Sequence, residues 1–304
     1  MSAPVRGSAS ARFLDPAVLG RISNLELLAK TVVEGFISGL HRSPFVGRSM
    51  DFAEYRAYMP GDDIRQIDWK LYSRSDRYYV KEFEGDTNTQ VTLALDISRS
   101  MDFGTAPLSK LDYGRTLASC LAYLASRQRD RVGLMLFDDE VREQIPPAAK
   151  HLQRALLSLS RLEPGGAGDL EKPLVRLADT SRRRGIVVVI SDFYEPPEQV
   201  VRAVRGLKVR GNDVLLFHLL DPAEIELPYD ETTDLEDLES GVRIALSGGD
   251  FARQYRLLVQ QHIETLRTRF IELGIDYTLI DTSEPLDRAL HRYLAGRLWS
   301  MKSR

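Results

Sequence analysis

Three side chains that carry oxygen follow a buried stretch of the chain at alternate positions. Val91 to Leu95 is mostly apolar, and the pattern Asp-x-Ser-x-Ser follows it as Asp96, Ser98 and Ser100. In a compact loop this spacing turns one carboxylate and two hydroxyls toward a common point. A hard cation such as Mg²⁺ takes oxygen ligands and keeps several of its waters. The spacing therefore predicts a Mg²⁺ site, which Mn²⁺ or Ca²⁺ could also fill.

A second aspartate occurs in a similar setting. The run Ile186–Ile190 suits a strand buried on both faces of a parallel sheet, and Ser191 and Asp192 follow it. Ligands of open α/β sheets bind outside the carboxyl ends of the strands, where the strand order reverses. We therefore expect Asp192 to lie at the same site as Asp96. A simpler role is also open, in which these side chains cap turns and bond backbone amides.

Strands and helices alternate along the rest of the chain. Further buried strands are expected at 131–137, 214–220 and 275–281, and helices at about 109–129, 150–162, 169–183, 196–209, 251–273 and 284–298. A short antiparallel strand at 140–145 should end at Pro146 and Pro147. Such alternation predicts an α/β fold, with a doubly wound, mostly parallel sheet covered on both faces by right-handed crossovers.

Changes in pattern divide the chain. Residues 1–12 are small and polar and predict a disordered arm, whereas 13–86 combine a helix with a β-rich segment. Asp15 and Pro16 are expected to start that helix. Residues 87–304 form the α/β domain, with a β excursion at about 221–249.

These residues resemble two known patterns. The loop Asp96–Ser100 and the later Ser191–Phe193 are similar to the metal-ion-dependent adhesion site, or MIDAS, of the von Willebrand factor A domain. The segment Phe52–Asp86 resembles the conserved block of the DUF58 family, bacterial proteins that place such a domain behind an N-terminal region. The resemblance extends over most of the chain after about Phe45. It implies the strand order 3-2-1-4-5-6, in which the strands that end at the two aspartates are neighbours.

The resemblance also implies a ligand set and a partner. Asp96, Ser98, Ser100 and Asp192 match the MIDAS ligands, but the second loop has Gly166-Ala167-Gly168-Asp169 where the pattern has a threonine. Asp169 or a water must then replace that hydroxyl, and metal binding should weaken. The DUF58 resemblance implies an adaptor or co-chaperone that acts with a MoxR-type AAA+ ATPase, a partner or client supplying an acidic residue to the metal.

Two other functions remain open. Asp96 could be the nucleophile of a metal-dependent hydrolase or phosphatase. Such phosphatases generally carry a second aspartate where this chain has Ser98, and none of the five histidines lies near Asp96 or Asp192 in the sequence. A metal-free interaction scaffold is the other reading. The chain has no Gly-x4-Gly-Lys-[Ser/Thr] loop, so a partner would hydrolyse any ATP.

Composition limits the class of protein. The 41 basic and 44 acidic residues give a formal charge of -3, which argues against a broad nucleic-acid-binding surface. The single cysteine, Cys120, excludes an internal disulfide framework, fits a reducing compartment and is expected to be buried on a helix. No apolar run approaches the roughly 18 residues of a membrane span. We therefore expect a cytoplasmic protein without a membrane span.

Overall fold

The computed structural model describes residues 24–42, 55–57, 79–81, 89–181, 183–228, 233–236, 243–246 and 249–302. The chain divides into two compact units, residues 1–35 together with 89–304, and residues 36–88. The predicted arm at 1–12 and the helix start at Asp15 and Pro16 lie outside the described residues.

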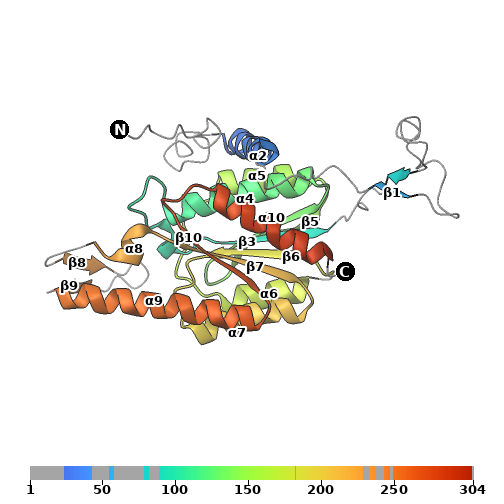
Figure 1. The fold of residues 1–304 in the computed structure, drawn as a ribbon. Coiled ribbons are helices and arrows are strands. Elements are labelled where there is room, and N and C mark those ends of the chain that lie inside the picture. Colours follow the sequence, from blue (N-terminus) through green and yellow to red (C-terminus); the bar gives the residue numbers. More distant parts are fainter. Residues whose placement is uncertain are drawn as a thin grey trace, which may run out of the picture. The chain divides into compact units, whose positions relative to one another are not determined.

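A six-stranded sheet forms the centre of the larger unit (Figure 1). Its strands are β3 (Gln90–Asp96), β4 (Arg131–Phe137), β5 (Val141–Ala148), β6 (Ile186–Ser191), β7 (Asp213–Leu220) and β10 (Asp276–Asp281). Their order is β10-β7-β6-β3-β4-β5, and only the β4–β5 pair is antiparallel. When β3 is counted as the first strand, this order is 3-2-1-4-5-6, so the predicted α/β fold is confirmed.

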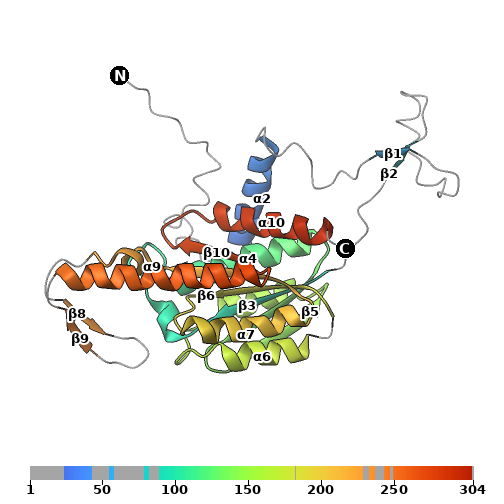
Figure 2. The same ribbon diagram turned by 60° about the horizontal axis from the view of Figure 1, so that its bottom comes forward.

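Helices cover both faces of this sheet (Figures 1 and 2). On one face lie α4 (Lys110–Arg127), α5 (Leu152–Ser160) and α10 (Asp287–Lys302), and on the other α6 (Glu171–Thr180), α7 (Pro197–Val209) and α9 (Gly249–Glu272). The α6, α7 and α9 side holds a continuous apolar core with β4, β6 and β7. Cys120 is buried on α4, as predicted. The sheet is therefore buried on both faces, and the loops at its strand ends extend from this core.

The N-terminal helix α2 (Leu25–Arg42) buries its apolar stripe. Leu28, Val32 and Phe36 are all less than 5% exposed. On its polar side Glu34 accepts a hydrogen bond from Tyr123 of α4 at 3.4 Å. The first part of α2 thus packs on the larger unit.

Three local expectations were wrong. Strand β5 continues through Pro146 and Pro147 to Ala148, because an edge strand tolerates residues that lack an N–H group. Helix α6 ends at Thr180 rather than near Arg183. The excursion after β7 begins with the short helix α8 (Pro222–Glu226), which Asp221 caps, instead of a strand.

Two small antiparallel pairs form sheets of their own, without hydrogen bonds to the six-stranded sheet. They are β1 (Tyr55–Ala57) with β2 (Tyr79–Lys81), and β8 (Thr233–Glu236) with β9 (Arg243–Leu246). The second pair lies within the predicted β excursion. In the parts of the chain that the structure describes, no helix is both long and apolar enough to cross a membrane.

Candidate functional site

Each of the five parallel strands delivers an aspartate at its carboxyl end. Asp96 and Asp281 are the last residues of β3 and β10, and Asp138, Asp192 and Asp221 directly follow β4, β6 and β7. We call this end of the sheet the carboxyl edge. The partners of each carboxylate there decide what chemistry the edge can support.

Asp96, Ser98 and Ser100 are brought together as predicted. The Ser98 amide donates to Asp96 Oδ1 at 2.9 Å, which folds the loop back on the end of β3. The 3₁₀ turn Arg99–Asp102 then places the Ser98 and Ser100 hydroxyl oxygens 3.1 Å apart. All three residues are buried, with exposed fractions of 4%, 1% and 7%. One carboxylate and two hydroxyls therefore form a compact oxygen cluster.

The β6 loop completes the surroundings of Asp96. Leu95 pairs with Ile190, so the two strands end side by side. The Ser191 hydroxyl donates to Asp96 Oδ2 at 2.7 Å and accepts from the Phe193 amide at 3.0 Å. Phe193 is a non-glycine residue with φ of 45°, which marks a tight, strained turn. This turn holds Ser191 and Asp192 at the carboxyl edge.

The electrostatic state of Asp96 follows from this packing. Burial, and then the negative charge of Asp192, raise the pKa of Asp96 to about 7, although hydrogen bonds from Ser191 and Ser98 act against the shift. Among the described residues no cation contacts its carboxylate. A positive ion placed here would favour the ionised form of Asp96.

Asp192 differs, because a buried lysine binds it. Lys110 Nζ lies 2.7 Å from Asp192 Oδ2 and 2.7 Å from Glu224 Oε1, and 4.4 Å from the centre of the Tyr194 ring. The Lys110 side chain is fully buried. Burial acts to lower the pKa of Lys110, but the charges of Asp192 and Glu224 outweigh burial and raise it. The ammonium group of Lys110 therefore balances the negative charge of Asp192.

Lys110 and Glu224 were not predicted from the sequence. Lys110 is the first residue of α4, where the helix dipole disfavours a cation. This unfavourable position was the only feature of the sequence that pointed to a buried acidic partner for Lys110. Glu224 belongs to the capping box of α8, in which it accepts from the Asp221 amide at 2.9 Å. The Asp221 carboxylate in turn accepts from the Thr105 amide at 2.7 Å. The β3 loop, the β6 loop and α8 are therefore tied together.

The second loop lies against the first, but Asp169 points elsewhere. The Arg99 amide donates to the Gly166 carbonyl at 2.8 Å, and the Gly165 amide donates to the Ile97 carbonyl at 2.6 Å. Asp169 accepts from the Glu171 amide at 2.9 Å and lies 3.9 Å from Lys172. Its carboxylate thus serves the start of α6. A ligand role for Asp169 stays a prediction.

The oxygen cluster could hold a hard divalent cation. In the described part of the chain no three histidine, cysteine, aspartate or glutamate side chains group as a metal cluster, so the candidate set depends on hydroxyls and water. Asp96, Ser98 and Ser100 offer three oxygens on one side, and Asp192 could reach an ion through a water. Mg²⁺ commonly keeps several waters in such sites. The residues therefore fit a weak Mg²⁺ site.

His218 is a buried histidine on β7. Its Nδ1 lies 2.7 Å from the Tyr277 hydroxyl of β10, and its ring packs edge-on against Phe193 at 5.5 Å between ring centres. Burial, and then His262, lower the pKa of His218 to about 3. His218 is therefore neutral at physiological pH and links β10 to the turn that carries Asp192.

Solved structures and known proteins resemble the chain. BatB from Bacteroides thetaiotaomicron aligns with a TM-score of 0.48 and 18% identity over 71% of this chain and 100% of that one. The VWA domain of SpRpn10 aligns with a TM-score of 0.41 and 13% identity over 66% of this chain and 94% of that one. The uncharacterized protein Rv1480 of Mycobacterium tuberculosis is 32% identical over 233 residues, 75% of this chain and 73% of its own length.

A family assignment follows from the sequence match. Residues 54–265 match the family described as protein of unknown function DUF58, and this range includes the carboxyl-edge residues from Asp96 to Glu224. The chain belongs to the DUF58 family.

Proposed function

We propose that this chain is a non-enzymatic adaptor that binds a partner protein at the carboxyl edge through a divalent cation. A von Willebrand A-like fold suggests a protein-interaction module, and the finer proposal rests on one observation. Asp96 is a buried carboxylate next to two hydroxyls, whereas the cation of the site, Lys110, binds Asp192 and Glu224.

The charge arrangement supports a metal at Asp96 rather than at Asp192. Asp96 would bind the ion directly with Ser98 and Ser100, while Asp192 would hold a water and keep its contact with Lys110. The bound ion would offer a Lewis-acidic position to a carboxylate of the partner. The neutral hydroxyls leave net positive charge on such an ion, which favours an acidic side chain as the last ligand.

The proposed partner is a MoxR-type AAA+ ATPase, or a client protein that this ATPase acts on. The resemblance of Phe52–Asp86 to the DUF58 block supports this choice, and so does the lack of an ATP-binding Gly-x4-Gly-Lys-[Ser/Thr] loop in the chain. In this arrangement the ATPase supplies the energy and the DUF58 protein selects what is bound.

A pull-down with purified MoxR-type ATPase tests the proposal. Wild type should retain the ATPase in millimolar Mg²⁺ and release it in EDTA, and Asp96→Ala should fail to retain it in either buffer. Asp179→Ala is the matched control, since the exposed Asp179 side chain of α6 pairs with Arg210 and lies outside the carboxyl edge. If the ATPase is retained equally in EDTA and by Asp96→Ala, the proposal of a metal-dependent adaptor is refuted.

Lys110 favours a second candidate, the metal-free scaffold. Its ammonium group already neutralises Asp192 and Glu224, so the carboxyl edge can persist without an ion. The scaffold predicts that the ATPase stays bound in EDTA. Adding a generic phosphoester to the same samples tests the hydrolase alternative. That alternative predicts that wild type hydrolyses the phosphoester and that Asp96→Ala does not.

A further inference from the structure

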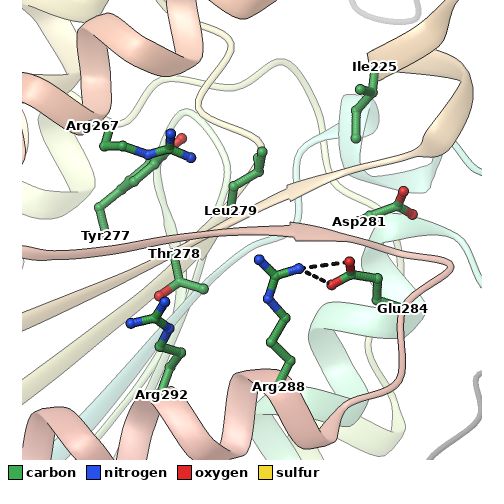
Figure 3. A pocket seen from close by; sticks show the side chains of 9 residues that line it. All are labelled: Ile225, Arg267, Tyr277, Thr278, Leu279, Asp281, Glu284, Arg288 and Arg292. Atoms are coloured by element: carbon green, nitrogen blue, oxygen red, sulfur yellow. Dashed lines mark hydrogen bonds and ion pairs between the residues drawn. The ribbon is translucent and has the colours of Figure 1, made fainter.

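The outer edge of β10 lies in a hollow flanked by arginines from two helices (Figure 3). The hollow has a volume of about 380 Å³. Its lining residues are Ile225, Arg267, Tyr277, Thr278, Leu279, Asp281, Glu284, Arg288 and Arg292. We call this region the β10 edge, and it is separate from the oxygen cluster at Asp96.

Residues from both faces of the strand line the same hollow. Tyr277 and Leu279 point to one face of the sheet, toward Arg267 of α9, whereas Thr278 points to the other face, toward α10 (Figure 3). Side chains alternate between faces along a strand, so a hollow that contains both sets must open on the edge of the strand. The hollow therefore gives access to the backbone of β10.

This backbone edge is available for pairing. β10 hydrogen-bonds β7 on one side, and among the described residues no strand pairs with its other side. An edge strand presents a row of backbone N–H and C=O groups that can pair with another extended segment. Peptides that add to a sheet in this way gain affinity from the backbone and specificity from the side chains that flank the edge.

The flanking side chains favour acidic residues. Arg292 on α10 is exposed and makes no ion pair within the described residues, and Arg267 pairs only with Glu264 on the surface of its own helix. Arg288 bonds Glu284 at 2.7 Å. Exposed pairs of this kind contribute little to stability, so a carboxylate from a partner can replace them.

The charges also give the edge a direction. Arg267 and Arg292 flank Tyr277 and Thr278 at one end, whereas Asp281 and Glu284 lie at the other end (Figure 3). A bound segment should therefore place its acidic residues near the arginines. We propose that the β10 edge binds an extended acidic segment of a partner protein by strand addition, without a metal.

Peptide binding measured by fluorescence anisotropy in EDTA tests this proposal. The probe is a labelled peptide of alternating threonine and glutamate, matched in length to the six residues of β10. Wild type should bind it, and Arg267→Ala with Arg292→Ala should weaken binding at least tenfold. Arg269→Ala, on α9 but outside the hollow, should change affinity less than twofold.

Two further peptides separate charge from strand addition. A glutamine version should lose at least tenfold in affinity. A version with proline at two consecutive central positions should not bind, because N–H groups of consecutive residues point to opposite sides of a strand and one of the two prolines then removes an N–H group that pairing needs. Equal binding of the proline peptide, or equal effects of Arg269→Ala and Arg292→Ala, would overturn the proposal. Analytical ultracentrifugation could instead show that wild type is a dimer and that Arg292→Glu dissociates this dimer. The β10 edge would then bind a second copy of the chain, and the proposal of an acidic partner segment would be overturned as well.

Discussion

The carboxyl edge and the β10 edge share Asp281, but the groups that dominate the two regions carry opposite charges. At the carboxyl edge, buried carboxylates outnumber cations, and the single lysine serves Asp192 and Glu224 rather than Asp96. At the β10 edge, exposed arginines surround an accessible strand. Burial accounts for the difference in chemistry, because a buried carboxylate without a counter-ion favours a proton or a metal, whereas exposed guanidinium groups bind carboxylates weakly and reversibly.

The comparison predicts different responses to changes in solution. Binding at the carboxyl edge should depend on divalent metal and on pH, since Asp96 must lose a proton to bind an ion. Binding at the β10 edge should depend on salt, since exposed charges are screened within about 10 Å at 0.1 M ionic strength.

The largest effect should come from Lys110→Met. Removing the ammonium group leaves Asp192 and Glu224 buried without their cation, and breaking a buried ion pair in this way costs about 3–5 kcal/mol. Urea denaturation should show this loss in the free energy of unfolding. Arg210→Met, which breaks the exposed pair with Asp179, should cost less than about 1 kcal/mol. Similar losses in the two variants would mean that Lys110 does not hold the edge together.

The Lys110 pairs also show what sequence reasoning could not reach. Asp96, Ser98 and Ser100 were predictable, because a buried strand and the loop after it are local in sequence. Lys110 and Glu224 are 114 positions apart, and only the fold brings them together. Asp192 was placed correctly next to β3, but its partner was missed. A lysine at the start of a helix, where the dipole disfavours it, is the kind of local conflict that should prompt a search for a buried acid.

The β10 edge was also invisible in the sequence. The strand at 275–281 and the helices on either side of it were predicted, with ends that differ by a few residues. Which strand lies at the edge depends on the order of the whole sheet. The direction in which Arg267 and Arg292 point depends on how α9 and α10 pack against that sheet. Those are tertiary properties, so the site needed coordinates.

Metal addition should give the next largest effect. At 100 times its dissociation constant Mg²⁺ should stabilise wild type by about 2.7 kcal/mol, seen as a rise in melting temperature, and Asp96→Asn should abolish the rise. The rise should be larger at pH 8 than at pH 6, because the pKa of Asp96 is raised to about 7 and the metal binds the ionised form. An equal rise in Asp96→Asn would place the metal elsewhere.

Acid should destabilise the fold around His218, which contacts Tyr277 at the β10 edge and Phe193 at the carboxyl edge. The pKa of His218 is lowered to about 3, so the native state binds fewer protons than the unfolded state between pH 6.5 and pH 3. The stability that His218 contributes is fully present above pH 6.5 and is lost as pH falls, by about 2 kcal/mol at pH 5. Urea melts from pH 7.5 to pH 5 should show this slope, and His218→Gln should reduce it. His151→Gln, at the start of α5, should leave the slope in place.

The smallest effect tests whether the two regions act independently. Arg292 is exposed and makes no ion pair among the described residues, so Arg292→Ala should change the free energy of unfolding by less than about 0.5 kcal/mol. It should also leave the Mg²⁺-induced rise in melting temperature unchanged, while it weakens binding of the acidic peptide. The reciprocal variant, Asp96→Asn, should bind that peptide as wild type does. A loss of the Mg²⁺ response in Arg292→Ala would show that the β10 edge and the carboxyl edge are coupled, and His218, which contacts Tyr277 and Phe193, would be the residue to test next.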